Sequence, residues 1–525
     1  MKTMKYFRWV LFAIWPLLWQ SCADDKGNYD YRELNDLGIT FDDSYSVIAR
    51  DPFSIHPVVE AGAFNPDNYT YEWKAYRQTG QEEPVLLGTA LNLDVELSLT
   101  QGTYLLVLNI KEKSTGIYYQ KTATLRVDTS TSLGWLVLCS DEGRARLDMV
   151  SHIKTGSVYR DLLAGTTPGT WRNPHQLVCD PNMAEPFYLL TGDGTTRLAN
   201  EEFQWNESYL IANEFGTGTF DGEARFLATR FPGKVLVDAS GRVYYCETLT
   251  GDGLFGSVRV NPFYVAPAVG YNAKGSPFVP AFVMWDKNNY RFVVCAQEFN
   301  SIGLANNQDM AMGNLAGMGF PTVNEDLFAW PQRTDRLSFV CMQNTRYDRN
   351  QDGNGMTYAV LENRNGDRFL YGFILGDLIS FSETKYGYAY EKAYYVDLSG
   401  CTDIAEASQF AFSSLKTYLY YAVGRKVYRV NFDASAPSAE LQFELPADEE
   451  ITLMKFYLWE QDDPDNHSYD LIVASRKSGT GEGVLRIYDG FAREGDFSGA
   501  EPVEQYGGFA DIVDVIYRES IVYQQ

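Results

Sequence analysis

The chain has 525 residues, of which 45% are hydrophobic and 15% aromatic, and its formal net charge is −25. This composition is typical of a globular protein, and the length predicts at least two domains. The acidic balance excludes the classes of protein that bind nucleic acid or dock electrostatically on anionic lipid, because both need a basic surface.

The first 21 residues are typical of a secretory signal. A basic start is followed by an apolar segment, Phe7–Leu18, which is too short to span a bilayer comfortably. A small residue, Ser21, then precedes Cys22, and this pair predicts a bacterial lipobox in which Cys22 is acylated and residues 1–21 are removed. Ordinary signal-peptidase cleavage is the alternative. Residues 22–38 would then form a lipidated tether.

Residues 39–128 predict an immunoglobulin-like β-sandwich. Apolar and polar residues alternate strictly over Leu91–Leu99, which is typical of a strand with one buried face. Trp73 lies in an earlier strand, and a Gly-Thr-Tyr sequence opens a late one. About 90 residues with such short strands fit an immunoglobulin-like domain.

Residues 133–525 predict a β-propeller. A motif of apolar strand, polar turn and second strand recurs seven times, starting at Gly134, Pro186, Gly241, Tyr290, Met356, Thr417 and Ser468. A spacing near 50 residues is typical of propeller blades, whose sheets can bury both faces only by packing on one another. Seven blades are the favoured number, with six or eight as alternatives. The segment 507–523 predicts a final strand that closes the ring. Unrelated hairpins in a sandwich or barrel are the alternative fold.

Catalytic motifs are not evident in the sequence. The four histidines are scattered, and there is no zinc-binding spacing, nucleophile elbow or P-loop. Beyond Cys22, the six cysteines form no CxxC pair and mostly lie in apolar runs, which favours small buried residues in strands. The 69 acidic residues leave open a pair of rim carboxylates of the kind that glycosidases use.

One loop has the composition of a calcium site. In "YDRNQDGNGMTY", Asp348, Asn350 and Asp352 alternate before Gly353, so three oxygen-bearing side chains could line one tight loop. The pattern departs from an EF-hand, because Ala359 stands where a bidentate glutamate is expected. The alternative is an ordinary Asn/Asp/Gly turn without metal.

The junction "SCADDKGNYDY", Ser21–Tyr31, followed by a sandwich and a long β-rich region, resembles the PKD-like surface lipoproteins of the Bacteroidetes. The resemblance implies a partner: such proteins are usually encoded beside SusC/SusD-like importers, in which a TonB-dependent barrel takes up oligosaccharides or peptides. It also implies that Asp24 and Asp25, just after Cys22, direct export to the outer face of the outer membrane.

These observations predict a non-catalytic, surface-exposed outer-membrane lipoprotein that is accessory to such an importer and binds oligosaccharide, peptide or the importer itself. Aromatic side chains on propeller rim loops would contact the ligand. The candidates are Trp171, Trp205, Trp285 and Trp330, for each of which blade packing is the alternative role. A propeller glycoside hydrolase or lyase and a purely structural subunit of the importer are the alternative functions. Calcium is the one cofactor considered.

Overall fold

The computed structural model describes residues 37–518, apart from 61–63, 80–82, 166–170, 181–185, 201–202, 231–232, 248–252, 257–262, 273–280, 297–321, 351–352, 383–384 and 459–466. The chain separates into two compact units, Met1–Asp128 and Thr129–Gln525. The signal segment and the tether, with Cys22, Asp24 and Asp25, lie outside the described residues. In the described part of the chain, no helix is long and apolar enough to cross a membrane.

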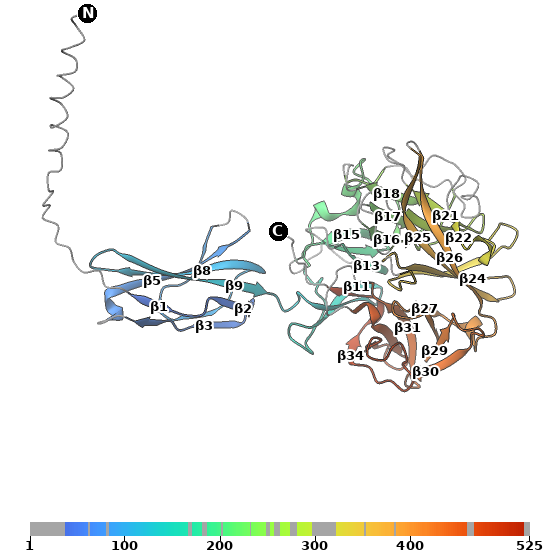
Figure 1. The fold of residues 1–525 in the computed structure, drawn as a ribbon. Coiled ribbons are helices and arrows are strands. Elements are labelled where there is room, and N and C mark those ends of the chain that lie inside the picture. Colours follow the sequence, from blue (N-terminus) through green and yellow to red (C-terminus); the bar gives the residue numbers. More distant parts are fainter. Residues whose placement is uncertain are drawn as a thin grey trace, which may run out of the picture. The chain divides into compact units, whose positions relative to one another are not determined.

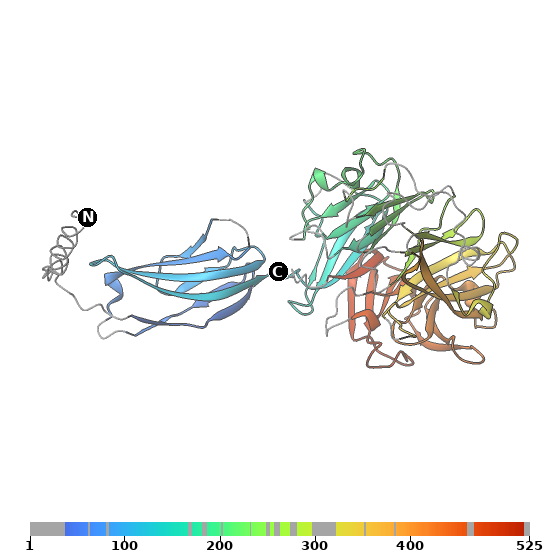
Figure 2. The ribbon, with the colours of Figure 1, turned by 45° about the horizontal axis from the view of Figure 1, so that its top comes forward.

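The first unit is a β-sandwich (Figures 1 and 2). Its strands are β1 (Gly38–Thr40), β2 (Ser44–Ile48), β3 (Pro52–Ile55), β4 (Val58–Glu60), β5 (Tyr69–Arg77), β6 (Val85–Gly88), β7 (Leu93–Glu96), β8 (Gly102–Glu112) and β9 (Tyr118–Asp128), with a 3₁₀ helix, η2, at Pro66–Asn68. One sheet has the order β2-β9-β8-β5-β6, and β1-β4 and β3-β7 form two further pairs. The core between them includes the fully buried Trp73.

A tyrosine fixes one corner of this sandwich. Tyr104, near the start of β8, is 3% exposed, and its hydroxyl donates to the backbone carbonyl of Thr100 at 2.9 Å. Such a bond, from a tyrosine to backbone a few residues upstream, is characteristic of immunoglobulin-like domains. The strand predicted over Leu91–Leu99 is shorter than expected, because β7 covers only Leu93–Glu96.

The second unit is a seven-bladed β-propeller, with seven sheets among its described residues. The first three contain β10 (Gly134–Asp141), β11 (Arg144–Ser151), β12 (Val158–Tyr159) and β35 (Asp511–Arg518); β13 (Pro174–Cys179), β14 (Phe187–Thr191) and β15 (Gly194–Leu198); and β16 (Ala224–Arg230), β17 (Gly233–Asp238) and β18 (Val243–Glu247). The colours in Figure 1 pass around the unit from teal through green and yellow to red, as successive sheets surround a central axis.

The remaining four sheets follow in chain order. They contain β19 (Gly270–Tyr271), β20 (Ala281–Asp286) and β21 (Arg291–Ala296); β22 (Thr322–Val323), β23 (Ser338–Thr345), β24 (Met356–Glu362), β25 (Arg368–Ser382) and β26 (Lys385–Asp397); β27 (Gln409–Phe412), β28 (Tyr418–Val423), β29 (Lys426–Asn431) and β30 (Ala439–Glu444); and β31 (Glu449–Phe456), β32 (Leu471–Lys477), β33 (Gly483–Tyr488) and β34 (Glu504–Phe509). Short 3₁₀ helices lie at η3 (Glu207–Tyr209), η4 (Ile211–Glu214), η6 (Glu325–Leu327), η7 (Ile404–Glu406) and η8 (His467–Tyr469).

The last strand of the chain completes the first sheet. β35 pairs antiparallel with β10 from Gly134↔Arg518 to Ser140↔Asp511, and the sheet order is β12-β11-β10-β35. This confirms the final strand predicted in segment 507–523. Closure of this kind satisfies the backbone groups that an open β10 edge would leave unpaired.

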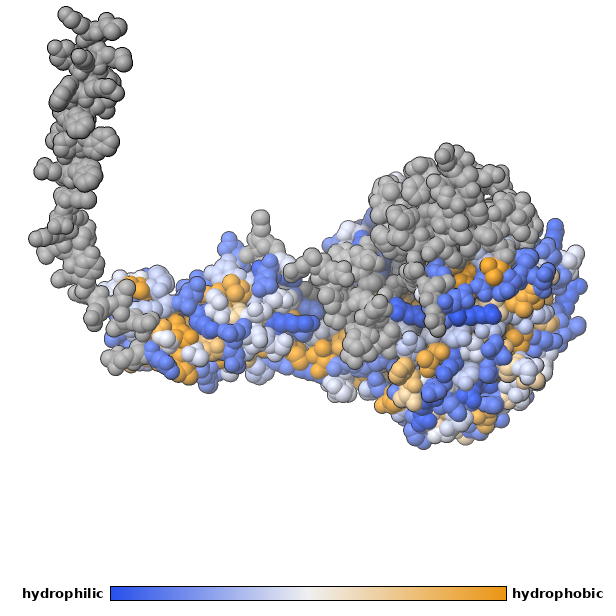
Figure 3. Space-filling model, viewed as in Figure 1, coloured by the Kyte–Doolittle hydropathy of each residue, from blue (hydrophilic) through white to orange (hydrophobic). Residues whose placement is uncertain are grey.

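The third and fourth predicted hairpins start inside turns of the structure. Gly241 lies in the turn between β17 and β18, and Tyr290 lies in the turn between β20 and β21. The second strands predicted for these two hairpins fall largely outside the described residues. In both cases a compact polar turn, "DASG" or "DKNNY", makes the reversal. Over the described surface visible in Figure 3, hydrophobic residues are scattered among hydrophilic ones.

A candidate binding site in the central channel

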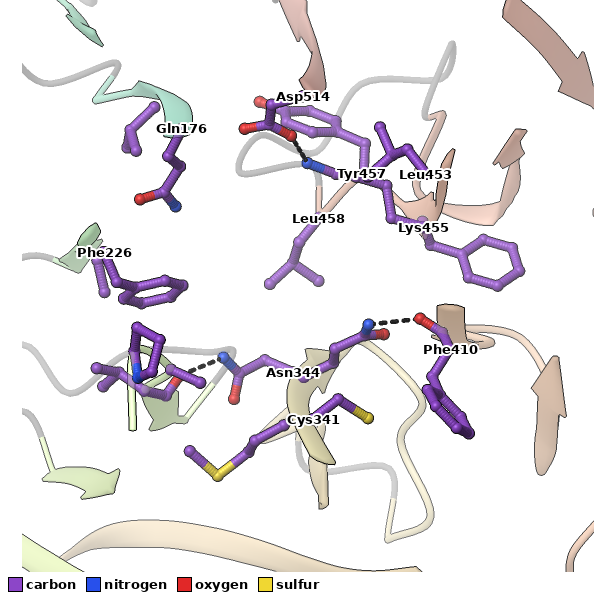
Figure 4. A pocket seen from close by; sticks show the side chains of 18 of the residues that line it. Gln176, Phe226, Cys341, Asn344, Phe410, Leu453, Lys455, Tyr457, Leu458 and Asp514 are labelled. Carbon is purple, nitrogen blue, oxygen red and sulfur yellow. Dashed lines mark hydrogen bonds and ion pairs between the residues drawn. The ribbon is translucent and has the colours of Figure 1, made fainter. Parts of the chain in front are cut away.

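A cavity of about 670 Å³ lies at the centre of the propeller. Residues of β13, β16, β19, β23, β27, β31 and β35 line it, one strand from each of the seven sheets. Figure 4 shows part of the lining, with Gln176, Phe226, Asn344 and Leu458 around the lumen. Because the innermost strand of every blade contributes, the site exists only when the whole ring is assembled.

Three amide side chains of the lining bind neighbouring blades. Gln176 accepts from the backbone N–H of Leu227 at 2.9 Å, and Gln343 donates to the carbonyl of Phe410 at 2.7 Å. Asn344 donates to the carbonyl of Val269 at 3.0 Å on the other side. These bonds link the innermost strands of adjacent sheets, so they stabilise the channel wall and occupy polar atoms that a ligand could otherwise contact.

An ion pair on the channel wall links the last strand to two other blades. The ammonium group of Lys455, on β31, lies 2.6 Å from Oδ1 of Asp514, on β35. Oδ2 of Asp514 also accepts the backbone N–H of Leu177, on β13, at 3.0 Å, and Oδ1 accepts that of Val515 at 2.9 Å. Three donors therefore hold the carboxylate, whereas in the described part of the chain Lys455 has one acceptor, Asp514.

A second charged group lies where β13 and β16 begin. Nε2 of His175 lies 2.8 Å from Oε1 of Glu223, and an amino group of Arg225 lies 2.8 Å from the same oxygen. His175 and Arg225 line the cavity, while Glu223 neutralises Arg225 from outside the lining. Among the described lining residues, Asp514 is the only carboxylate.

Most of the remaining lining is apolar or aromatic. It includes Phe226, Phe339, Phe410, Tyr457 and Leu458. Cys341 is also part of this wall, and burial raises the pKa of its thiol to about 12, so the reactive thiolate is not populated near neutral pH. Apolar and polar groups thus contribute about equally to the cavity surface, which is more polar than a typical site for small molecules.

Two of the four predicted ligand-binding tryptophans are core residues. Trp285 lies within β20 and is 1% exposed, and Trp330 is 4% exposed among the aromatic side chains of the same core. The expected rim position is wrong for both, because their indoles fill the space between blades.

The other two tryptophans form a partly buried pair. The rings of Trp171 and Trp205 lie 6.5 Å apart, and Nε1 of Trp205 donates to the hydroxyl of Thr196 at 2.9 Å. Both pack against the core of the first blades and neither lines the cavity. A role in ligand binding stays a prediction for these two.

The predicted calcium loop is only partly described. Asp348 accepts the backbone N–H of Gly353 at 2.8 Å, and the amide of Asn350 donates to Glu391 at 2.8 Å. Asp352 lies outside the described residues. Among the described residues, no group of three or more His, Cys, Asp or Glu side chains could hold a metal ion. Calcium binding here therefore stays a prediction.

The channel residues were not identified from the sequence. Lys455, Asp514, Gln176 and Asn344 belong to four innermost strands that are far apart in the chain. One signal was available for Asp514 alone, which is a polar residue inside the strand predicted in segment 507–523. That signal marks an unusual position but does not show which residues it meets.

Comparisons with known proteins agree with the N-terminal prediction. The model of the PKD-like family matches residues 22–169. No curated protein matches the chain. Similar solved structures include a quinonprotein alcohol dehydrogenase-like protein from Bacteroides thetaiotaomicron VPI-5482, which is 11% identical, with 91% of this chain and 97% of that chain covered and a TM-score of 0.41. Apo AztD from Citrobacter koseri is 8% identical, with 86% and 98% covered and a TM-score of 0.32.

Proposed function

We propose that this protein is a non-catalytic lipoprotein on the outer face of the outer membrane, anchored through Cys22, which serves as an accessory to a SusC/SusD-like importer. Its propeller binds an oligosaccharide or peptide nutrient in the central channel. The observation that carries the binding role is the cavity of about 670 Å³, whose surface combines apolar and aromatic side chains with a similar share of polar groups. Sugar rings and peptide side chains both stack on such surfaces.

The geometry of the wall supports binding rather than chemistry at this site. The amides of Gln176, Gln343 and Asn344 hold neighbouring strands, and the carboxylate of Asp514 already accepts three hydrogen bonds. A group that takes part in proton transfer must reach the reacting atom. These polar groups are instead held against the scaffold, which gives the channel a fixed shape.

The experiment is a binding screen with a variant that fills the channel. Ser408 is exposed, lines the cavity and can carry a larger side chain, so Ser408→Trp should block ligand entry. Ser435→Trp, at an exposed position outside the cavity, is the matched control. Purified protein is titrated with oligosaccharides and peptides by calorimetry. Binding that Ser408→Trp abolishes and Ser435→Trp preserves would support the proposal.

Three results would contradict it. Equal binding by both variants would place the ligand outside the channel. Turnover of a bound polysaccharide would favour the hydrolase or lyase alternative. Co-purification with the importer, without binding of any glycan or peptide, would favour a purely structural subunit. The anchoring is tested separately: Cys22→Ala should release the protein from membranes, and Asp24→Ala/Asp25→Ala should reduce its exposure to external protease on whole cells.

A further inference from the structure

The charges of the channel differ from those of the protein as a whole. The chain carries a net charge of −25, so anionic ligands are repelled from most of its surface. Among the lining residues the charged groups are Arg225, Lys455 and Asp514, with His175 as a further titratable group. Two cations therefore face one carboxylate inside an otherwise acidic molecule.

The two cations are not equivalent. Arg225 is 41% exposed and shares Glu223 with His175, so its charge is balanced at the edge of the cavity. Lys455 is 25% exposed and lies among apolar residues on the wall (Figure 4). An ammonium group has three N–H donors, and Asp514 accepts only one of them. Lys455 can therefore donate further hydrogen bonds to a molecule in the lumen.

Pairing with Asp514 does not prevent Lys455 from donating hydrogen bonds to a ligand. Its own oxygens also accept the backbone N–H groups of Leu177 and Val515, so its negative charge is shared among three donors. The carboxylate in turn holds Lys455 in one orientation. A positioned cation on a low-dielectric wall attracts an anion more strongly than a mobile surface lysine does.

We infer that the channel ligand carries a carboxylate that pairs with Lys455, while its apolar or ring-shaped body packs on the wall formed by the partly exposed Phe226 and Leu458. This inference rests on the proposed binding function and names the ligand class for that site. A carboxylate of this kind has two sources that fit the proposed function: the uronic acid of an acidic oligosaccharide and the C-terminus of a peptide.

The test compares acidic and neutral forms of each source. Galacturonic acid oligomers are titrated against galactose oligomers of the same length, and peptides with a free C-terminus against the same peptides as amides. An acidic form is expected to bind at least tenfold more tightly than its neutral partner, and the advantage should shrink as salt increases. The pair that shows this difference identifies the source.

Lysine variants then locate the effect. Lys455→Met should remove the advantage of the acidic form, and Lys455→Arg should retain most of it. Because Lys455→Met leaves Asp514 unpaired, Lys455→Met/Asp514→Asn provides a second test with no uncompensated charge. Lys477→Met is the matched control, since Lys477 is 32% exposed and lies 3.0 Å from Glu482 but does not line the channel.

The outcomes separate this inference from the proposed function. If neutral ligands bind as tightly as acidic ones and Ser408→Trp abolishes both, the channel binds ligands but the carboxylate inference is overturned. An acidic preference that survives in Lys455→Met and in the double variant also overturns it. If no form binds in the channel, the proposed function fails and the inference fails with it.

Discussion

At the scale of single residues, Asp514 accepts three hydrogen bonds on the channel wall. It links β35 to β31 through Lys455 and to β13 through the backbone of Leu177. Asp514→Ala would remove the acceptor of the partly buried ammonium group and of the backbone N–H groups of Leu177 and Val515. We expect the free energy of unfolding to fall by about 3 kcal/mol, at the low end for buried pairs because Lys455 is partly exposed.

Chemical denaturation of both proteins measures this loss. The control is Asp511→Ala on the same strand, where Asp511 is 40% exposed and lies 3.8 Å from Arg476. That change should lower the free energy of unfolding by less than about 1 kcal/mol, because exposed ion pairs usually contribute no more than this. Equal losses in the two variants would show that Asp514 has no special structural role.

At the scale of elements, a buried ion pair ties together three strands of the last blade. Arg486, on β33, lies 2.7 Å from Glu449, on β31, and the hydroxyl of Ser475, on β32, donates to the same carboxylate at 2.5 Å. Burial by itself raises the pKa of Glu449, but the hydrogen bonds from Arg486 and Ser475 together outweigh it, so the pKa lies below its usual range.

The direction of this shift fixes a dependence on pH. A carboxyl whose pKa is lower in the folded state stabilises the fold at pH values above its unfolded pKa, near 4.3. That contribution is lost as the pH falls through the folded value. Wild-type protein should therefore lose stability more steeply below about pH 4.5 than Glu449→Gln does. Denaturant titrations from pH 6 to pH 3 measure the difference, and Glu450→Gln, an exposed neighbour, should follow the wild-type profile.

Closure of the ring by β35 can be tested with a backbone change. Val515 is fully buried and pairs with Val137 of β10. Val515→Pro removes an N–H and a hydrogen bond to Asp514, and it distorts the strand, so it should prevent stable folding of the propeller. Val515→Ala removes only apolar volume. It should lower the free energy of unfolding by about 1–3 kcal/mol, and unfolding should remain cooperative. Thermal unfolding followed by circular dichroism distinguishes the two, and similar stability of both would mean that pairing with β10 is dispensable.

At the scale of the whole molecule, the division into residues 1–128 and 129–525 predicts two domains that fold by themselves. Limited proteolysis should cut near the Ser/Thr-rich segment Thr129–Leu133 and release a resistant, all-β fragment that starts there. Mass spectrometry of the fragments identifies the site. The isolated fragment should keep the melting temperature that the propeller has in the full chain. A fragment that unfolds on release would show that the two units depend on each other.

The sequence predicted the architecture of this molecule better than its site. Alternating apolar residues and regular spacing carry the information for strands and blades, because each hairpin pairs residues that are close in the sequence. The buried positions of Trp285 and Trp330 do not follow from the sequence, since a tryptophan outside an obvious apolar run can still fill a core between blades. Lys455 and Asp514 are 59 residues apart, and their contact depends on the ring as a whole, which no local pattern encodes.

The position of β35 also has a consequence for the order in which the protein is made. The strand that completes the first blade is the last described strand of the chain, so β10 waits for its partner until residues 511–518 have been made. During that time its apolar sequence, "GWLVLC", offers an open edge on which other chains can add. A chain that ends before Asp511 should therefore aggregate when it is refolded from denaturant, whereas a chain that includes β35 should refold as a monomer, and light scattering measures the difference.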